Sequence, residues 1–371
     1  MSYFTGEKKG ELMDQQELIS SYKSLTPKDS EYLNYMMGSF SETERAIPQS
    51  SLNPQTMGEI VTFEIRKIED LESATILRKL MILLKPQTWL TVLIPFIVIS
   101  RVDASSAFST TMLLLFSLIT LMIYANWQTD LADHIEGWDR LNGENNKSVL
   151  QKGWFTGQQL QKWSKGVLAF NLILGIPLIM SNPWVLVPYA LGVLALLLLL
   201  PRWWRQSVGT GVSSLFIFLL TGPLLAIGID LAIDGKMNKN SLFLGIGWGV
   251  WMSFRRQQSV YSKQWKPFYK NSTYSFLSLG FDRAKALMRL MIVGVPGIML
   301  LSFIFVSGGA AWFFPLLVTH SFFVFWELHY NEKIQSSISS SLKSLQILFR
   351  WHFYAISMMM VIGAIIWKTT I

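Results

Sequence analysis

Apolar residues are gathered into long runs that short polar connections separate, and only the first 75 or so residues lack such a run. A hydrocarbon core about 30 Å thick needs roughly 20 apolar residues per helix. The pattern therefore predicts an all-α, polytopic membrane protein. Its nine expected membrane helices lie near residues 86–100, 107–126, 166–181, 184–201, 208–230, 241–254, 286–307, 310–328 and 351–368.

The polar connections alternate in charge. Lys and Arg are concentrated before the first expected span and after the second, fourth, sixth and eighth spans, while the intervening connections carry few. Because Lys and Arg accumulate in cytoplasmic loops, the pattern predicts a cytoplasmic N-terminus and a C-terminus on the opposite side of an integral, multi-pass membrane protein.

Residues 1–75 form a polar extension of mixed charge that precedes the expected membrane domain at 76–371. It contains no apolar stretch of the kind found in a signal peptide, which agrees with a cytoplasmic start. Its composition favours a partly disordered tail that contains one short helix, and the alternative is a segment that docks a protein partner.

Composition narrows the possible chemistry. Of the 371 residues, 51% are hydrophobic and none is cysteine, which excludes disulfides, thiolate metal sites and cysteine nucleophiles. The net charge of +8 is explained by cytoplasmic loops that lie near anionic lipid. We therefore expect membrane lipid as a partner and no nucleic acid.

The second expected span runs directly into "YANWQTDLADHIEGWDRLNG", residues 124–143. If the helix continues, its period of 3.6 residues places Asn126, Asp130 and Asp133 within about 60° of one another, with His134 at the border. Converging oxygen ligands suit Mg²⁺, which proteins often share with a phosphate group. The spacing is compatible with a Mg²⁺–diphosphate site and equally with a solvated helix end whose acids pair with nearby Lys and Arg.

This acidic stretch resembles the first motif of the UbiA superfamily of intramembrane prenyltransferases, N-D-x-x-D-x-x-x-D, in which Asn126 and Asp130 match. The run "SVLQKG" at 148–153 is similar to the family's closing turn. Two further stretches are most similar in sequence to the chlorophyll and bacteriochlorophyll synthase branch of the family. They are "SFLSLGFDRAKAL" at 275–287 and "LLKPQTW" at 83–89.

The resemblance implies transfer of a prenyl group from a prenyl diphosphate to an acceptor at the cytoplasmic face. It implies Asp130 and Asp133 as Mg²⁺ ligands and Asn126 as the residue that orients them, so all three are expected to be catalytic. Terpene cyclisation, which needs no separate acceptor, is an alternative within the same family.

The sequence departs from the family where the second acidic motif belongs. No Asp or Glu lies between Asp234 and Asp282, and Arg255, Arg256, Lys263 and Lys266 stand in that region. Trp127 also replaces an aspartate of the first motif. We therefore expect one protein-held Mg²⁺ ion in place of two.

Two interpretations of these departures stay open. Fixed cations can replace the missing metal because Arg and Lys bind phosphate, or the chain is a non-catalytic relative that binds a lipid or pigment or supports a membrane complex. The candidate substrate-binding residues are Arg255, Arg256, Lys263, Lys266, Lys147 and His134.

Other polar residues fall within or beside the eighth expected span. His320, Glu327, His329 and Glu332 could contact an acceptor, whereas a satisfied polar residue in the bundle is the simpler interpretation of His320. The stretch "GIGWG" at 245–249 predicts close helix packing by small residues.

Overall fold

The computed structural model describes most of the chain as helices that follow one another in sequence. Residue contacts divide it into two compact units, Met1–Lys85 with Ile123–Val167 and Pro86–Met122 with Leu168–Ile371, and each unit is described by itself. The described residues are 22–39, 41–49, 60–102, 108–136, 148–181, 183–206, 211–264, 280–306, 310–335 and 340–370.

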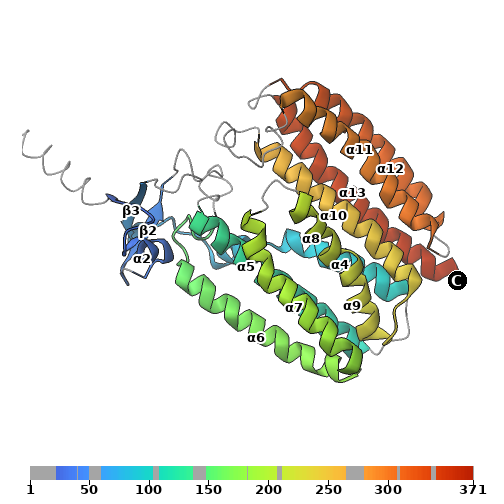
Figure 1. Ribbon diagram of the computed structural model, residues 1–371, viewed down its shortest axis with the longest axis horizontal. Helices are drawn as coiled ribbons and strands as arrows, with labels where there is room; N and C mark the ends of the chain where they lie inside the picture. The colour runs from blue at the N-terminus through green and yellow to red at the C-terminus, as the bar shows by residue number, and fades with distance from the viewer. Residues whose placement is uncertain are drawn as a thin grey trace, which may run out of the picture. The chain divides into compact units, whose positions relative to one another are not determined.

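The first unit contains a small sheet that the polar composition of residues 1–75 does not indicate. Strands β1 (Tyr22–Leu25), β2 (Glu44–Pro48) and β3 (Val61–Lys67) pair antiparallel in the order β1-β3-β2, and α2 (Tyr32–Met37) accompanies them (Figure 1). Phe63 is fully buried between the rings of Tyr32 and Tyr35, at centroid distances of 5.9 and 5.8 Å. An apolar core thus organises the described part of the extension.

A second apolar cluster joins three helices of the first unit. These helices are α3 (Ile76–Leu84), the C-terminal part of α5 (Phe108–Glu136) and the N-terminal part of α6 (Gly157–Ser181), and the short helix η1 (Ile68–Asp70) precedes α3. The buried members of the cluster come from α3, α5, α6 and the turn before α6, and they are Leu83, Trp127, Leu131, Val149, Leu150 and Leu160.

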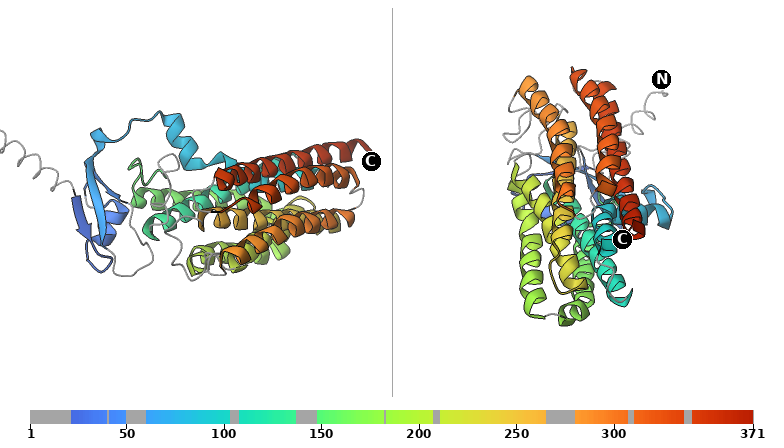
Figure 2. Two further views of the ribbon diagram at one scale, coloured as in Figure 1. Left: turned by 90° about the horizontal axis from the view of Figure 1, so that it is seen from above. Right: turned by 90° about the vertical axis from the view of Figure 1, so that its right-hand side faces the viewer.

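The second unit is a bundle of long apolar helices, with α10 to α13 arranged as neighbours (Figures 1 and 2). Besides the rest of α5 and α6, its helices are α4 (Pro86–Val102), α7 (Pro183–Gln206), α8 (Gly211–Thr221), α9 (Pro223–Ile233), α10 (Lys239–Gln264), α11 (Phe281–Ile304), α12 (Ala310–Glu332) and α13 (Ser340–Thr370). Within the described residues, the predicted apolar ranges lie almost entirely on helices, and the range 208–230 is divided between α8 and α9.

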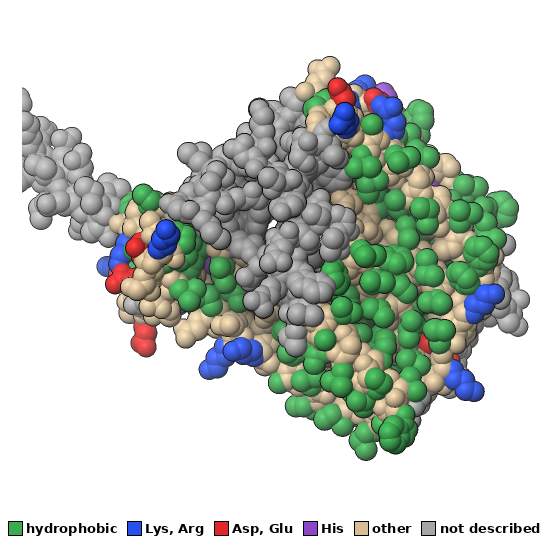
Figure 3. Space-filling model, viewed as in Figure 1, with side chains coloured by type: hydrophobic (Ala, Val, Ile, Leu, Met, Phe, Trp, Pro, Cys, Tyr) green, Lys and Arg blue, Asp and Glu red, His purple; other side chains and the backbone are tan. Residues whose placement is uncertain are grey.

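Within the described ranges, five helical segments are long and apolar enough to cross a membrane, or six if α3 and α4 count as one broken span. This finding supports an integral, multi-pass membrane protein, whereas the count of nine spans and the orientation of the termini stay predictions. Hydrophobic side chains cover much of the helical surface seen in Figure 3. Such a surface suits contact with lipid.

Tryptophans fill the centre of the second unit and bond to neighbouring helices. Trp248 of α10 donates from Nε1 to the carbonyl oxygen of Thr91 at 2.9 Å, and Trp312 of α12 donates to that of Met360 at 3.0 Å. Both side chains are fully buried. Their indole N–H groups therefore satisfy backbone carbonyls where α10 meets α4 and where α12 meets α13.

Glycines bring α10 against the junction of α8 and α9. A Cβ atom at Gly222 would lie 2.7 Å from the Gly245 carbonyl oxygen and 2.7 Å from the Gly249 Cα atom. Only residues without a Cβ atom permit so close an approach. The packing role predicted for "GIGWG" is confirmed.

Candidate functional site

The C-terminal end of α5 carries the predicted acidic face. The helix continues without a break to Glu136, as the sequence pattern predicts, so Asn126, Asp130 and Asp133 share one side of it. Asp130 is 8% exposed and His134 is 3% exposed, whereas Asn126 and Asp133 are half-buried. The face therefore combines one well-buried carboxylate with two more accessible oxygen-bearing side chains.

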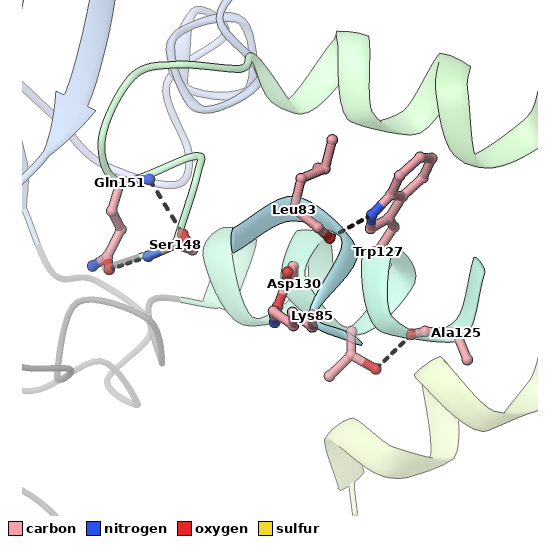
Figure 4. A network of polar contacts seen from close by, with 8 residues as sticks. Leu83, Lys85, Ala125, Trp127, Asp130, Ser148 and Gln151 are labelled. Atoms are coloured by element: carbon pink, nitrogen blue, oxygen red, sulfur yellow. Dashed lines mark hydrogen bonds and ion pairs between the residues drawn. The ribbon is translucent and has the colours of Figure 1, made fainter. Parts of the chain in front are cut away.

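Asp130 already has a cation partner. The ammonium group of Lys85 forms an ion pair with Oδ1 of Asp130 (Figure 4). Lys85 caps the C-terminus of α3 in a left-handed conformation, with φ of 47°, and its side chain is 30% exposed against 10% for that of Asp130. Sequence reasoning missed this residue, although it lies within the quoted "LLKPQTW" stretch.

Trp127, which stands where the family has an aspartate, belongs to the apolar core of the first unit. Its Nε1 donates a hydrogen bond to the Leu83 carbonyl oxygen at 2.9 Å (Figure 4), and its side chain is 4% exposed. An aspartate there would be too short to reach Leu83 and would bury a charge. Trp127 and Asp130 thus hold two successive parts of the α3 C-terminus against α5.

The "SVLQKG" stretch forms a tight turn before α6. The backbone N–H of Ser148 donates to Oε1 of Gln151, and the N–H of Gln151 donates to Oγ of Ser148, at 3.3 and 3.2 Å (Figure 4). Gly153 ends the turn with φ of +68°, which glycine adopts without strain. Lys147, one of the predicted substrate-binding residues, lies outside the described residues.

Glu72 ties this turn to the segment before α3. Its carboxylate pairs with Lys152 at 2.9 Å and with Arg78 at 3.0 Å, and its carbonyl oxygen accepts a hydrogen bond from Nε1 of Trp154 at 3.0 Å. The hydrogen bond from Lys152 and the charges of Lys152 and Arg78 lower the pKa of Glu72 below its ordinary value. Residues of the polar extension are thus built into the same unit as the acidic face.

The predicted cationic group lies on α10 in the second unit. Arg255 donates to the Phe349 carbonyl oxygen at 2.7 Å and to Oε1 of Gln258 at 3.2 Å, with its guanidinium 4.9 Å from the ring centroid of Phe353. Part of its donor capacity thus joins α10 to α13. Arg256 is half-buried on the same helix.

The structure does not describe the side chains of the two predicted lysines, Lys263 and Lys266. Lys263 lies in α10 but its side chain is not described, and Lys266 lies outside the described residues. Since the acidic face and the arginines belong to different units, their juxtaposition across a shared diphosphate stays a prediction.

The donor chemistry of the acidic face fits Mg²⁺. Carboxylate and amide oxygens are the ligands this ion prefers, and it commonly completes its coordination with water and substrate phosphates. Across the described ranges, no group of three or more His, Cys, Asp or Glu side chains is placed to hold a metal ion. A Mg²⁺ site built on Asn126, Asp130 and Asp133 stays a prediction.

No family model matches the chain, and no curated protein matches it. Solved structures do. A digeranylgeranylglyceryl phosphate synthase shares 15% identity and a TM-score of 0.54, over 78% of this chain and 98% of its own. A UbiA homologue from Archaeoglobus fulgidus, bound to GPP and Mg²⁺, shares 16% identity and a TM-score of 0.54, over 76% of this chain and 99% of its own.

The same homologue bound to DMAPP and Mg²⁺ gives a TM-score of 0.50 at 16% identity. These likenesses extend over nearly the full length of the matched structures, and none of them specifies the chlorophyll-synthase branch. The chain has the fold of the UbiA superfamily.

Proposed function

We propose that the protein is an intramembrane prenyltransferase, which moves a prenyl group from a prenyl diphosphate to an acceptor at the cytoplasmic face. The observation that carries the proposal is the acidic face at the end of α5, where Asp130 pairs with the partly exposed Lys85. The fold supports it, because similar structures bind GPP or DMAPP together with Mg²⁺.

Asp130 and Asp133 would hold one Mg²⁺ ion, with Asn126 orienting the group. When bound, Mg²⁺ withdraws negative charge from a diphosphate and so weakens the bond between its oxygen and the allylic carbon. Lys85 neutralises Asp130 before substrate binds. Once a metal ion takes over that role, the ammonium of Lys85 becomes available to a phosphate oxygen.

Cations from residues 255–266 would bind the diphosphate together with the metal ion. Arg255, Arg256, Lys263 and Lys266 replace the second carboxylate cluster of the family, and Lys147 and His134 are the further substrate-binding candidates. A guanidinium has five N–H donors. Arg255 can therefore keep its bonds to Phe349 and Gln258 and still offer donors to a phosphate.

The test is diphosphate release from allylic prenyl diphosphates of several chain lengths, by purified protein in lipid nanodiscs with Mg²⁺. Asp130→Asn and Asp133→Asn should each reduce release by roughly 10²–10³-fold, the loss typical of one preorganised electrostatic group. Asp70→Asn is the matched control, since Asp70 is exposed in η1 of the same unit. Its release should equal that of the parent protein.

Three outcomes separate the alternatives. Absence of release at every chain length contradicts the enzyme proposal and supports a non-catalytic membrane protein that binds a lipid or pigment or supports a complex. Release without any acceptor, accompanied by a cyclic hydrocarbon, identifies a terpene cyclase. Equal activity of the parent and the Asp130 and Asp133 variants would show that the metal lies elsewhere.

A further inference from the structure

Three buried ionisable side chains form a hydrogen-bonded chain between α12 and α13. Nδ1 of His320 lies 2.9 Å from Nε2 of His352, and Nδ1 of His352 lies 2.8 Å from Oε1 of Glu327. The sequence singled out His320 and Glu327, which are seven residues apart on one face of α12, but not His352. We call this set the Glu–His–His chain.

The Glu–His–His chain is isolated from solvent. Glu327 and His352 are completely buried and His320 is 2% exposed. Phe323 stacks on the ring of His352 at 4.7 Å with an interplanar angle of 7°, and Trp251 packs edge-on against both histidine rings, at 5.2 and 4.7 Å. Apolar and aromatic walls therefore surround groups that are costly to bury unless they serve a purpose.

Both ends of the chain retain hydrogen-bonding capacity. Within the part of the protein that the structure describes, Nε2 of His320 and Oε2 of Glu327 are buried atoms without a hydrogen-bond partner. Unsatisfied buried polar atoms are rare and commonly mark a functional group or a bound ligand. A proton can bind to a lone pair of either atom without a cavity, because it occupies almost no volume.

A neighbouring cation partly offsets the cost of burying a negative charge at one end of the chain. The guanidinium of Arg255, on α10, interacts electrostatically with Glu327 and His352, while Arg350 and Tyr354 of α13 interact with Arg255 in turn. A cation at this position offsets a negative charge on Glu327. The chain can therefore exist in an anionic form and in a neutral form.

The two forms differ by one proton that enters at His320. In the anionic form Nδ1–H of His352 donates to the Glu327 carboxylate, Nδ1–H of His320 donates to Nε2 of His352, and Nε2 of His320 is unprotonated. A proton added there displaces Nδ1–H of His320 onto Nε2 of His352, and Nδ1–H of His352 onto Glu327. Charge moves from −1 to 0, and neither imidazole becomes a cation.

From this geometry we infer that the Glu–His–His chain is a proton relay, with Nε2 of His320 as its accepting end and Glu327 as the group that stores the proton. The inference rests on the proposed function only for the source of that proton. In prenyl transfer the carbon–oxygen bond to the diphosphate breaks and its electron pair leaves with the diphosphate. The acceptor supplies the pair for the new bond, and the proton it gives up must pass to a base.

The relay can be tested without any substrate, because the chain has only four histidines. Protein labelled with ¹⁵N-histidine is titrated in nanodiscs, and the resonances are assigned with single His→Gln variants. On acidification His320 and His352 should change together from the Nδ1–H to the Nε2–H tautomer, in one transition. In Glu327→Gln both should keep one tautomer, since an amide cannot store the proton.

Two matched variants accompany this titration. Glu332→Gln and His329→Gln alter an acid and a histidine of the same helix that are more exposed, and both should leave the joint transition unchanged. If Glu327→Gln does not fold, His320→Gln replaces it, because loss of the accepting end should fix His352 in one tautomer.

Independent titration of the two histidines, absence of any tautomer change, or the same transition in Glu327→Gln would overturn the relay. Since no prenyl diphosphate is present, these outcomes are independent of the diphosphate-release assay. A relay without diphosphate release would contradict the proposed function alone, and diphosphate release without a relay would contradict this inference alone.

Discussion

The acidic face of α5 and the Glu–His–His chain both place carboxylates on apolar helices, but the partners of these carboxylates differ in exposure to solvent. Asp130 is paired with the partly exposed Lys85, a compact charge on a long, flexible side chain. Glu327 is paired with a fully buried histidine, which is bonded in turn to a second histidine. One carboxylate thus has a partly exposed partner and the other has a completely buried one.

This difference indicates which ligand each region can accept. A metal ion with a diphosphate needs access, and the partly exposed Lys85 lies at the accessible end of α5. A proton is far smaller, and it can pass along the hydrogen bonds that join Glu327, His352 and His320. Under the two proposals, ions exchange in the first region and protons are transferred in the second.

The largest effect is expected from Trp127→Asp, which would restore the family's aspartate to the acidic region. It should cost at least the roughly 3–5 kcal/mol typical of truncating a buried tryptophan, and more because a carboxylate is buried. The measurement is thermal unfolding in detergent, followed by size-exclusion chromatography after heating. Trp127→Phe, which loses the bond to Leu83 and part of the buried ring but introduces no charge, should cost less than the aspartate variant. Equal stability of the aspartate variant would show that Trp127 is not a core residue.

The second prediction concerns the fixed counter-charge near the Glu–His–His chain. Arg255→Met removes the hydrogen bond to Phe349 and the cation that faces Glu327, so stability should fall by about 1.5–3 kcal/mol. Arg289→Met is the control, because Arg289 forms an exposed ion pair with Glu332, a kind worth at most about 1 kcal/mol. If both variants lose the same stability, Arg255 does not stabilise the chain.

A smaller effect is expected from Lys85→Met, which removes the cation paired with Asp130. Mg²⁺ should bind about tenfold more tightly, the lower end of the effect that a neighbouring cation has on proton binding by a carboxylate. Calorimetric titration of Mg²⁺ without diphosphate measures it, because a phosphate group would also contact the Lys85 ammonium. Lys79→Met, on the same helix but over the Trp154 ring at 5.8 Å, should bind Mg²⁺ as the parent does. Weaker binding in Lys85→Met would mean that Lys85 helps to build the metal site.

The smallest effect concerns the pH dependence of the ion pairs at Glu72. Because the pKa of Glu72 is lowered in the folded protein, its contribution to stability is present above the ordinary glutamate pKa and is lost as pH falls through the lowered pKa. Parent protein should therefore exceed Glu72→Gln slightly at neutral pH, and the two should converge in acid. Glu69→Gln, which alters an exposed neighbour in η1, should track the parent throughout. A difference that persists in acid would contradict the pairing.

The sequence predicted the helices and the acidic face because both depend on spacing within a single element. Asn126, Asp130 and Asp133 recur at helical intervals, and the apolar runs are as long as a bilayer requires. Lys85 and His352 were missed because each becomes a partner only through packing, 45 residues from Asp130 in one case and 25 from Glu327 in the other. Contacts of that kind follow from tertiary structure and leave no periodic signal.

The sheet in the first unit was missed for a different reason. β3 does carry a signal, since Val61, Phe63 and Ile65 alternate with polar residues, but β1 and β2 are only four and five residues long and show no regular alternation. One alternating segment predicts a sheet only when neighbouring segments show the same alternation. The polar average composition of residues 1–75 therefore did not indicate the sheet.

The glycine contact between α8, α9 and α10 has a consequence for how the chain enters the membrane. Ser214–Ile233 is one apolar stretch of 20 residues, and an insertion machinery that responds to hydrophobicity would admit it as a single unit. Yet Pro223 opens α9 directly after Gly222, and the contact there requires Gly245 and Gly249, which are synthesised later. Topology at this point is thus decided before tertiary packing, and a bulkier residue at Gly245 should leave insertion intact while impairing the later assembly of the bundle.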